Sequence, residues 1–225
     1  FPSGAMVSQT SGHGDFRLRS QLPGTPGALD PAQEAGISAL ADGAPLVLMR
    51  VREQLMKGAS QVKMMAGGGV ASLWDPIDSL QFLEEELSAG VRAAADWGTY
   101  VCVHVYVPDG IRRAVRAGVR CIEHGQLADE ETVRMMAGEG VWWSLQPFLG
   151  DADANPKADP AQRAQQAMIA EGTARAYELA LKHDVRTAFG TDVLMNPAGP
   201  ATQGRQLAKL ARFMDPLEAL RTATG

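Results

Sequence analysis

Two of the four histidines in this 225-residue chain lie at the ends of two neighbouring apolar segments, one histidine at the end of each. The stretch Tyr100–Gly125 is predicted to form a strand, a helix and a second strand, with His104 ending the first strand and His124 ending the second. Imidazole nitrogens bind divalent metals and transfer protons. Taken singly, each histidine is more often a hydrogen-bonded core group, so a chemical interpretation needs partners from other strands.

Lys63 and Asp192 are the partners that the sequence offers. Lys63 lies in the apolar segment Gln61–Met65, and Asp192 follows the predicted strand Val185–Phe189. The carboxyl ends of parallel strands form one face of an α/β fold, so these residues and the two histidines are expected to meet there. Imidazole and carboxylate suit zinc or similar ions. Lys63 fits such a set if its amine has reacted with CO2 to give a carbamate.

The elements that would position these residues alternate from residue 45 onward between amphipathic helices and short apolar strands. Such alternation predicts a parallel sheet with crossover helices. Five strands are clear, and a weak one is expected near Ala5–Ser8, followed by a long loop up to residue 45. An open doubly wound sheet and a (β/α)8 barrel both fit. A complete barrel needs eight strands and about 250 residues, so a barrel formed by this chain would be incomplete.

Composition excludes several functions. The formal net charge is −5 with no basic run, which argues against nucleic-acid binding, and no apolar run approaches the length of a membrane helix. The two cysteines, Cys102 and Cys121, are expected to be buried thiols. The chain has no initiator Met and is expected to be part of a longer protein. Two localisations therefore remain open: cytoplasmic, or periplasmic or secreted.

Four segments together resemble the amidohydrolase superfamily, in particular the branch of metal-dependent Xaa-Pro dipeptidases and imidazolonepropionase-like enzymes. They are Val62–Gly69, Tyr100–Tyr106, Ile122–Gly125 and Gly190–Asp192. Two further segments, Ser8–Arg17 and Gly140–Pro147, are similar to a subgroup of carboxypeptidase-like amidases that includes ochratoxin-hydrolysing enzymes.

The resemblance implies an amidohydrolase TIM barrel that holds two divalent metal ions, with zinc the first expectation. It implies that carboxylated Lys63 bridges the two metals and that His104 and His124 bind the second. Asp192 would bind the first metal and shuttle the proton.

The resemblance also assigns Tyr106 and His13 to substrate binding. The family's His-x-His pair is absent from the chain. Residues 1–225 are therefore expected to form a single partial barrel domain with roughly strands 3–8, without strands 1–2 and the small β-sandwich. Such a domain is expected to bind metal poorly and to turn over little by itself.

The function implied is hydrolysis of an amide or peptide bond in a small molecule by a metal-activated hydroxide. A dipeptide, an Xaa-Pro substrate or an N-acyl amino acid is expected. The alternatives are a cyclic-amide hydrolase or deaminase of the imidazolonepropionase type, and a non-catalytic fragment. Relatives of this kind often form homo-oligomers. Apolar side chains near the strand ends are expected either to line a substrate pocket or to pack in the core: Met64, Met65, Leu73, Trp142, Trp143 and Phe148.

Overall fold

A computed structural model describes residues 1–225 except 22–28, 72–73, 155, 194–196 and 225. Its centre is a parallel sheet with the strand order β2-β1-β3-β4-β5-β6-β7. The strands are β1 (Met6–Ser8), β2 (Ser38–Leu40), β3 (Val62–Met65), β4 (Val101–Val105), β5 (Cys121–His124), β6 (Trp142–Leu145) and β7 (Thr187–Phe189).

Helices connect the strands, and α1, α5 and α6 each begin at an aspartate that caps the helix. Asp30, Asp129 and Asp159 each accept hydrogen bonds from the first backbone N–H groups of a helix. The helices are α1 (Pro31–Glu34), α2 (Ala44–Met56), α3 (Glu84–Ala95), α4 (Pro108–Arg116), α5 (Glu130–Gly138), α6 (Pro160–Lys182), α7 (Gln203–Lys209) and α8 (Pro216–Thr224). Short 3-10 turns lie at Arg19–Gln21, Gly199–Thr202 and Leu210–Arg212.

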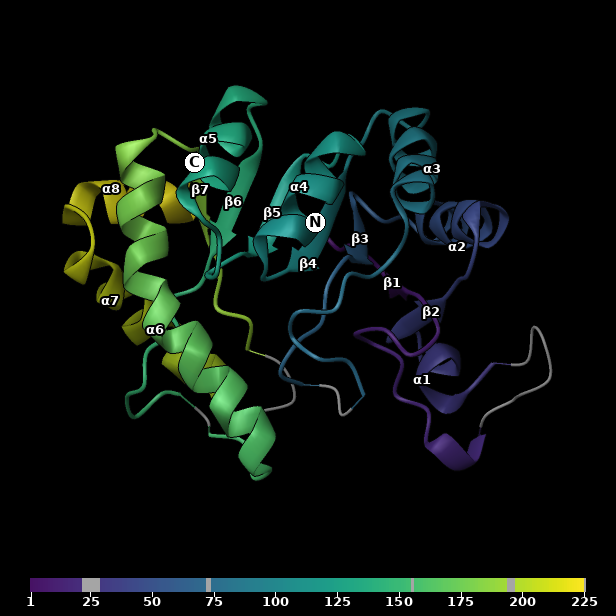
Figure 1. Cartoon of the computed structure of the whole chain (residues 1–225), viewed down its shortest axis with the longest axis horizontal. Coiled ribbons are helices and arrows are strands. Elements are labelled where there is room, and N and C mark those ends of the chain that lie inside the picture. Colours follow the sequence, from purple (N-terminus) through teal and green to yellow (C-terminus); the bar gives the residue numbers. More distant parts are fainter. Residues whose placement is uncertain (22–28, 72–73, 155, 194–196, 225) are drawn as a thin grey trace.

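The two faces of the sheet differ because side chains alternate along each strand. Val101, Val103 and Val105 of β4 belong to the main hydrophobic core, whereas Cys102 and His104 between them do not. Helices α2 to α6 contact one another in sequence order and cover the core face (Figure 1). Right-handed crossovers between strands that advance in one direction put all these helices on one side, as in a barrel wall.

The structure confirms the predicted parallel α/β fold and corrects one part of it. Residues 31–40, expected to be loop, form helix α1 and strand β2. The strand pairs residue by residue with β1, from Met6 opposite Ser38 to Ser8 opposite Leu40. A strand of three residues is too short to show a periodic pattern in the sequence. It becomes recognisable only through its pairing with the distant β1.

The sheet is not closed. Among the described strands, β2 pairs with β1 alone and β7 pairs with β6 alone. No helix in the described ranges is long and apolar enough to span a bilayer.

Candidate active site

Four aromatic rings gather where β4 and β5 end. The His104 ring lies 4.7 Å from the His124 ring and 5.1 Å from the Tyr106 ring, measured between centroids. Tyr106 and His124 are 5.0 Å apart. His13, from the loop after β1, stacks on the His104 ring with centroids 4.1 Å apart. The fold thus brings His104 and Tyr106, two residues apart at the end of β4, together with His124 from the next strand and His13 from a loop about 90 residues earlier.

His104 is held as a neutral imidazole with one lone pair available. Its Nε2 lies 3.0 Å from the carbonyl oxygen of Gly68, which can only accept, so Nε2 carries the proton and Nδ1 does not. Nδ1 has no hydrogen-bond partner among the described residues. Burial lowers the pKa of His104 well below its usual range, and the nearby His13, His124 and Lys63 lower it further.

His124 has the mirrored arrangement. Its Nδ1 lies 2.8 Å from Oε1 of Gln146, which leaves Nε2 as the unprotonated nitrogen. Burial is the main cause that lowers the pKa of His124 to about 3, and the charge of Lys63 adds to it. Both histidines therefore have the state required of a metal ligand: neutral, with one nitrogen protonated and hydrogen-bonded and the other bearing a free lone pair.

His13 is fixed by a buried carboxylate. Its Nδ1 lies 3.0 Å from Oδ2 of Asp75, whose side chain is 1% exposed. Asp75 also accepts from the backbone N–H of Gly69. A Cβ at Gly69 would lie 2.3 Å from the His13 ring, so glycine is required for this close approach.

Lys63 and Asp192 are linked to the ring cluster through their charges. Lys63 is half-buried in β3 and forms no ion pair with the described residues, while its charge acts on His104, His124 and Asp192. Desolvation raises the pKa of the Asp192 carboxyl, and Lys63 and His13 oppose that shift. Asp192 as a whole remains accessible to solvent.

Tyr106 completes the cluster as a hydroxyl donor. Its ring is buried, and this burial raises the pKa of Tyr106 well above its usual value, with a further contribution from the charge of Asp192. The phenol therefore stays protonated at neutral pH.

The donor set suits a divalent metal only when Lys63 is included. Within the described ranges, no group of three or more His, Cys, Asp or Glu side chains is arranged to hold an ion. Two neutral imidazoles with free lone pairs are present, and a carbamate on Lys63 would add the anionic oxygens that zinc also accepts.

The apolar side chains expected near the strand ends divide between core and site. Met64 and Trp143 belong to the core beneath the helices, and Trp142 is 43% exposed. Met65 is buried. Phe148 stacks near His124, with centroids 6.0 Å apart, and packs against the small apolar cluster of Ile77, Tyr106 and Ile169. Leu73 lies outside the described residues.

Sequence reasoning missed Asp75 and Gln146. Gln146 directly follows β6, so the rule that polar residues gather at strand ends would have found it. Asp75 lies in a loop without periodicity, and no local pattern indicates its contact with His13, 62 positions away.

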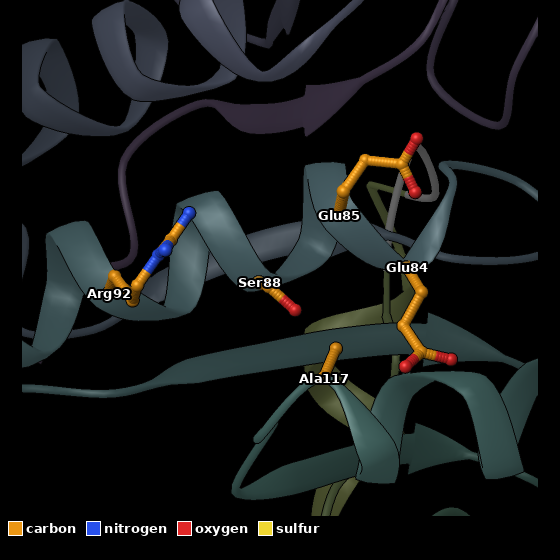
Figure 2. Close-up of a pocket in the computed structure, with 5 residues that line it drawn as sticks. All are labelled: Glu84, Glu85, Ser88, Arg92 and Ala117. Carbon is orange, nitrogen blue, oxygen red and sulfur yellow. The ribbon is translucent and has the colours of Figure 1, made fainter.

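One surface depression lies away from this cluster. It has a volume of about 580 Å³ and is lined by Glu84, Glu85, Ser88 and Arg92 of α3 and by Ala117, which follows α4. Figure 2 shows Glu84, Glu85, Ser88 and Arg92 along one helix and Ala117 on a neighbouring segment. None of the predicted site residues lines it, so the ring cluster remains the candidate site.

Comparison with known proteins shows the family of the chain. Residues 7–225 match the model of the amidohydrolase family, and the chain belongs to that family. It is 36% identical over 235 residues to ochratoxinase of Aspergillus niger, covering 100% of this chain and 48% of that protein. The chain thus spans about half the length of the curated relatives it matches.

Solved structures give the same picture. A prolidase crystallised with N-methylphosphonate-L-proline has a TM-score of 0.88 and 39% identity, covering 100% of this chain and 55% of that one. The A. niger ochratoxinase structure has a TM-score of 0.83 and 33% identity, covering 99% and 52%. A Xaa-Pro dipeptidase with bound methionine has a TM-score of 0.81 and 28% identity, covering 100% and 55%.

Proposed function

We propose that this chain carries a large part of the catalytic site of a metal-dependent hydrolase that cleaves an amide or peptide bond in a small molecule. The observation that supports this most is the pair of buried, neutral histidines, His104 and His124, in ring contact at the ends of consecutive strands. Membership of the amidohydrolase family supports the same reaction class.

The proposed ligands are a carbamate on Lys63, His104, His124 and Asp192, which together would hold two divalent ions. When bound, such ions supply hydroxide at neutral pH and polarise the substrate carbonyl. Zinc is the proposed metal because the donors are imidazole nitrogen and carboxylate-type oxygen.

Asp192 is the proposed proton carrier. The pKa of its carboxyl is raised toward neutral pH. A group accepts and returns a proton most effectively when its pKa is near the working pH. In the proposed reaction Asp192 takes a proton from the nucleophile and delivers it to the leaving amide nitrogen, so that no net charge accumulates.

Tyr106 and His13 are the proposed substrate contacts. The protonated Tyr106 hydroxyl is suited to donate to a carboxylate or carbonyl oxygen of the substrate. His13, held by Asp75, is suited to a second polar contact next to His104.

The proposed substrates are dipeptides, Xaa-Pro dipeptides and N-acyl amino acids. Two solved relatives support this choice: one is a prolidase complexed with N-methylphosphonate-L-proline, and the other is a Xaa-Pro dipeptidase with bound methionine. Both ligands contain an amino acid.

A substrate panel tests the proposal. The full-length protein, loaded with zinc, is assayed on Xaa-Pro dipeptides, N-acyl amino acids and cyclic amides, with release of free amine as the readout. We expect hydrolysis of at least one acyclic class. Zinc-loaded protein that opens cyclic amides and leaves every acyclic amide intact would overturn the substrate assignment. Protein that binds no zinc would overturn the metal assignment.

A further inference from the structure

The backbone of His124 is unusual. In the parallel register of β4 and β5, His124 lies opposite Val105, whose side chain points into the helix-covered core. Alternation along β5 would send the His124 ring to that core face as well. The ring instead contacts His104 and Tyr106 on the other face. A backbone φ of +72° at His124 turns the side chain from the core face of the sheet to the opposite face.

A left-handed φ is disfavoured for any residue with a Cβ, and it persists where the surroundings impose it. Here the surroundings come from β6. The indole Nε1 of Trp143 donates to the carbonyl oxygen of His124 at 2.6 Å. Trp143 is fully buried, so this bond holds a backbone turn against the core.

The next residue shows how closely the indole fits. Gly125 also has a φ of +72°, and a Cβ there would lie 2.7 Å from Nε1 of Trp143. The turn at His124 and Gly125 and the Trp143 side chain therefore match each other in shape.

Gln146 holds the other end of His124. Its Oε1 accepts from Nδ1 of the ring, and its Nε2 donates to the backbone carbonyl of Ser144 at 3.1 Å. The Ser144 contact sets which way the amide points. The amide in turn sets which ring nitrogen of His124 carries the proton. Gly190 leaves room for this amide, because a Cβ there would lie 2.9 Å from its Nε2.

We propose that Trp143 and Gln146 are positioning residues that hold His124 from β6 and the residue after it. Trp143 holds the His124 backbone and Gln146 holds the His124 ring, so that the Nε2 lone pair would be available to a metal ion. The proposal rests on the proposed function, in which His124 is a ligand. It adds two residues that act through His124.

The test uses variants with matched controls. Gln146→Met removes the amide and keeps a linear side chain, and Gln126→Met makes the same change at an equally buried glutamine that bonds to the backbone of Gln146. Trp143→Phe removes the indole N–H, and Trp142→Phe makes the same change at the exposed neighbour. Circular dichroism confirms that each variant is folded.

The first readout is the tautomer of His124 in metal-free, full-length protein, from ¹⁵N NMR of the imidazole nitrogens. The His124 signals are identified by their absence in His124→Gln. Wild type is expected to be the Nδ1–H tautomer, and Gln146→Met is expected to be a mixture. The second readout is zinc affinity by competition with a chromophoric chelator. It is expected to fall about 10- to 100-fold in Gln146→Met and Trp143→Phe.

Two results would overturn this proposal: wild-type tautomer and zinc affinity in both test variants, or equal losses in the controls. If Trp143→Phe does not fold, the result for Gln146→Met decides the proposal, because that variant leaves the core intact. Wild-type protein without zinc affinity would refute the proposed function, and the tautomer comparison would still decide whether Gln146 positions His124.

Discussion

His13 stacks face to face on His104, with ring centroids 4.1 Å apart and ring planes 9° from parallel. The stack joins the loop after β1 to the end of β4, and the buried Asp75 holds it in place from the loop after β3. Three separate parts of the chain therefore fix one side of the candidate site.

Removing the charge of Asp75 should disturb this side alone. We expect Asp75→Asn to lower kcat/KM about 10²-fold, because a displaced His13 no longer meets the substrate correctly. Steady-state kinetics on the best substrate of the panel measures this. Asp78→Asn is the control, since Asp78 lies in the same loop with an exposed side chain. Equal effects in both variants would contradict a specific role for Asp75.

Adding a methyl group at Gly69 should break the same stack by contact. The new Cβ would lie 2.3 Å from the His13 ring, so we expect Gly69→Ala to cost ~1–3 kcal/mol of stability from overpacking. Urea unfolding measures this. Gly138→Ala is the control, because nothing lies within 4 Å of a Cβ there. A Gly69→Ala variant as stable as wild type would show that the loop carrying His13 moves aside at no cost in stability.

Asp192→Asn should separate catalysis from metal binding. We expect it to lower turnover at least 10²-fold, because the amide cannot carry the proton, while much of the metal stays bound. Kinetics and elemental analysis of the same sample measure the two effects. Activity within tenfold of wild type would exclude Asp192 as the proton carrier.

Lys63→Ala should remove the proposed carbamate bridge. We expect loss of metal and activity, and partial recovery of both when acetate or propionate is added, because a small carboxylate can occupy the vacated bridging position. The measurement is activity and zinc content across a carboxylate titration. Full metal content in Lys63→Ala without added acid would count against the bridge.

Stability should also depend on pH through Asp129, which caps α5 and pairs with Arg112. Although desolvation acts the other way, hydrogen bonds from Thr132 and Arg112 lower the pKa of Asp129 below its usual value of 3.8. A lowered folded-state pKa means that the stabilisation is present above pH 3.8 and is lost as pH falls below it.

We expect Asp129→Ala to cost about 1 kcal/mol at neutral pH and Asp129→Asn much less, because asparagine also caps helices well. Urea unfolding at neutral and acidic pH measures both variants. The difference between wild type and Asp129→Asn should shrink in acid. A constant difference would show that the carboxylate charge does not contribute.

The sequence predicted what depends on local pattern. Apolar strands of four or five residues, such as β4 and β5, can be recognised from their own sequence. Parallel topology then brings their ends together. His104 and His124 could be identified in this way, and the structure brings their rings into contact. The metal-binding roles of these two residues, and of Lys63 and Asp192, remain predictions.

What the sequence did not predict depends on contacts between distant segments. Strand β2 exists because it pairs with β1, about 30 residues earlier. Asp75 reaches His13 from an irregular loop. The direction of the His124 ring follows from a backbone angle that strand alternation does not foresee. The sequence left open whether Trp143 lines a pocket or packs in the core, and the structure places it in the core, where its indole bonds to the backbone of His124.

The arrangement of β6 has a consequence for how this site can vary. Within the described sheet, β6 is the single neighbour of β7, the strand that precedes Asp192, and β6 and the residue after it also supply both contacts that hold His124. A shift of β6 would therefore move Asp192 and His124 together, and both proposed ligands would lose their positions at once. New substrate preferences should arise in the segments beyond this strand, around Phe148, because there a side chain can change without altering the alignment of the reacting groups.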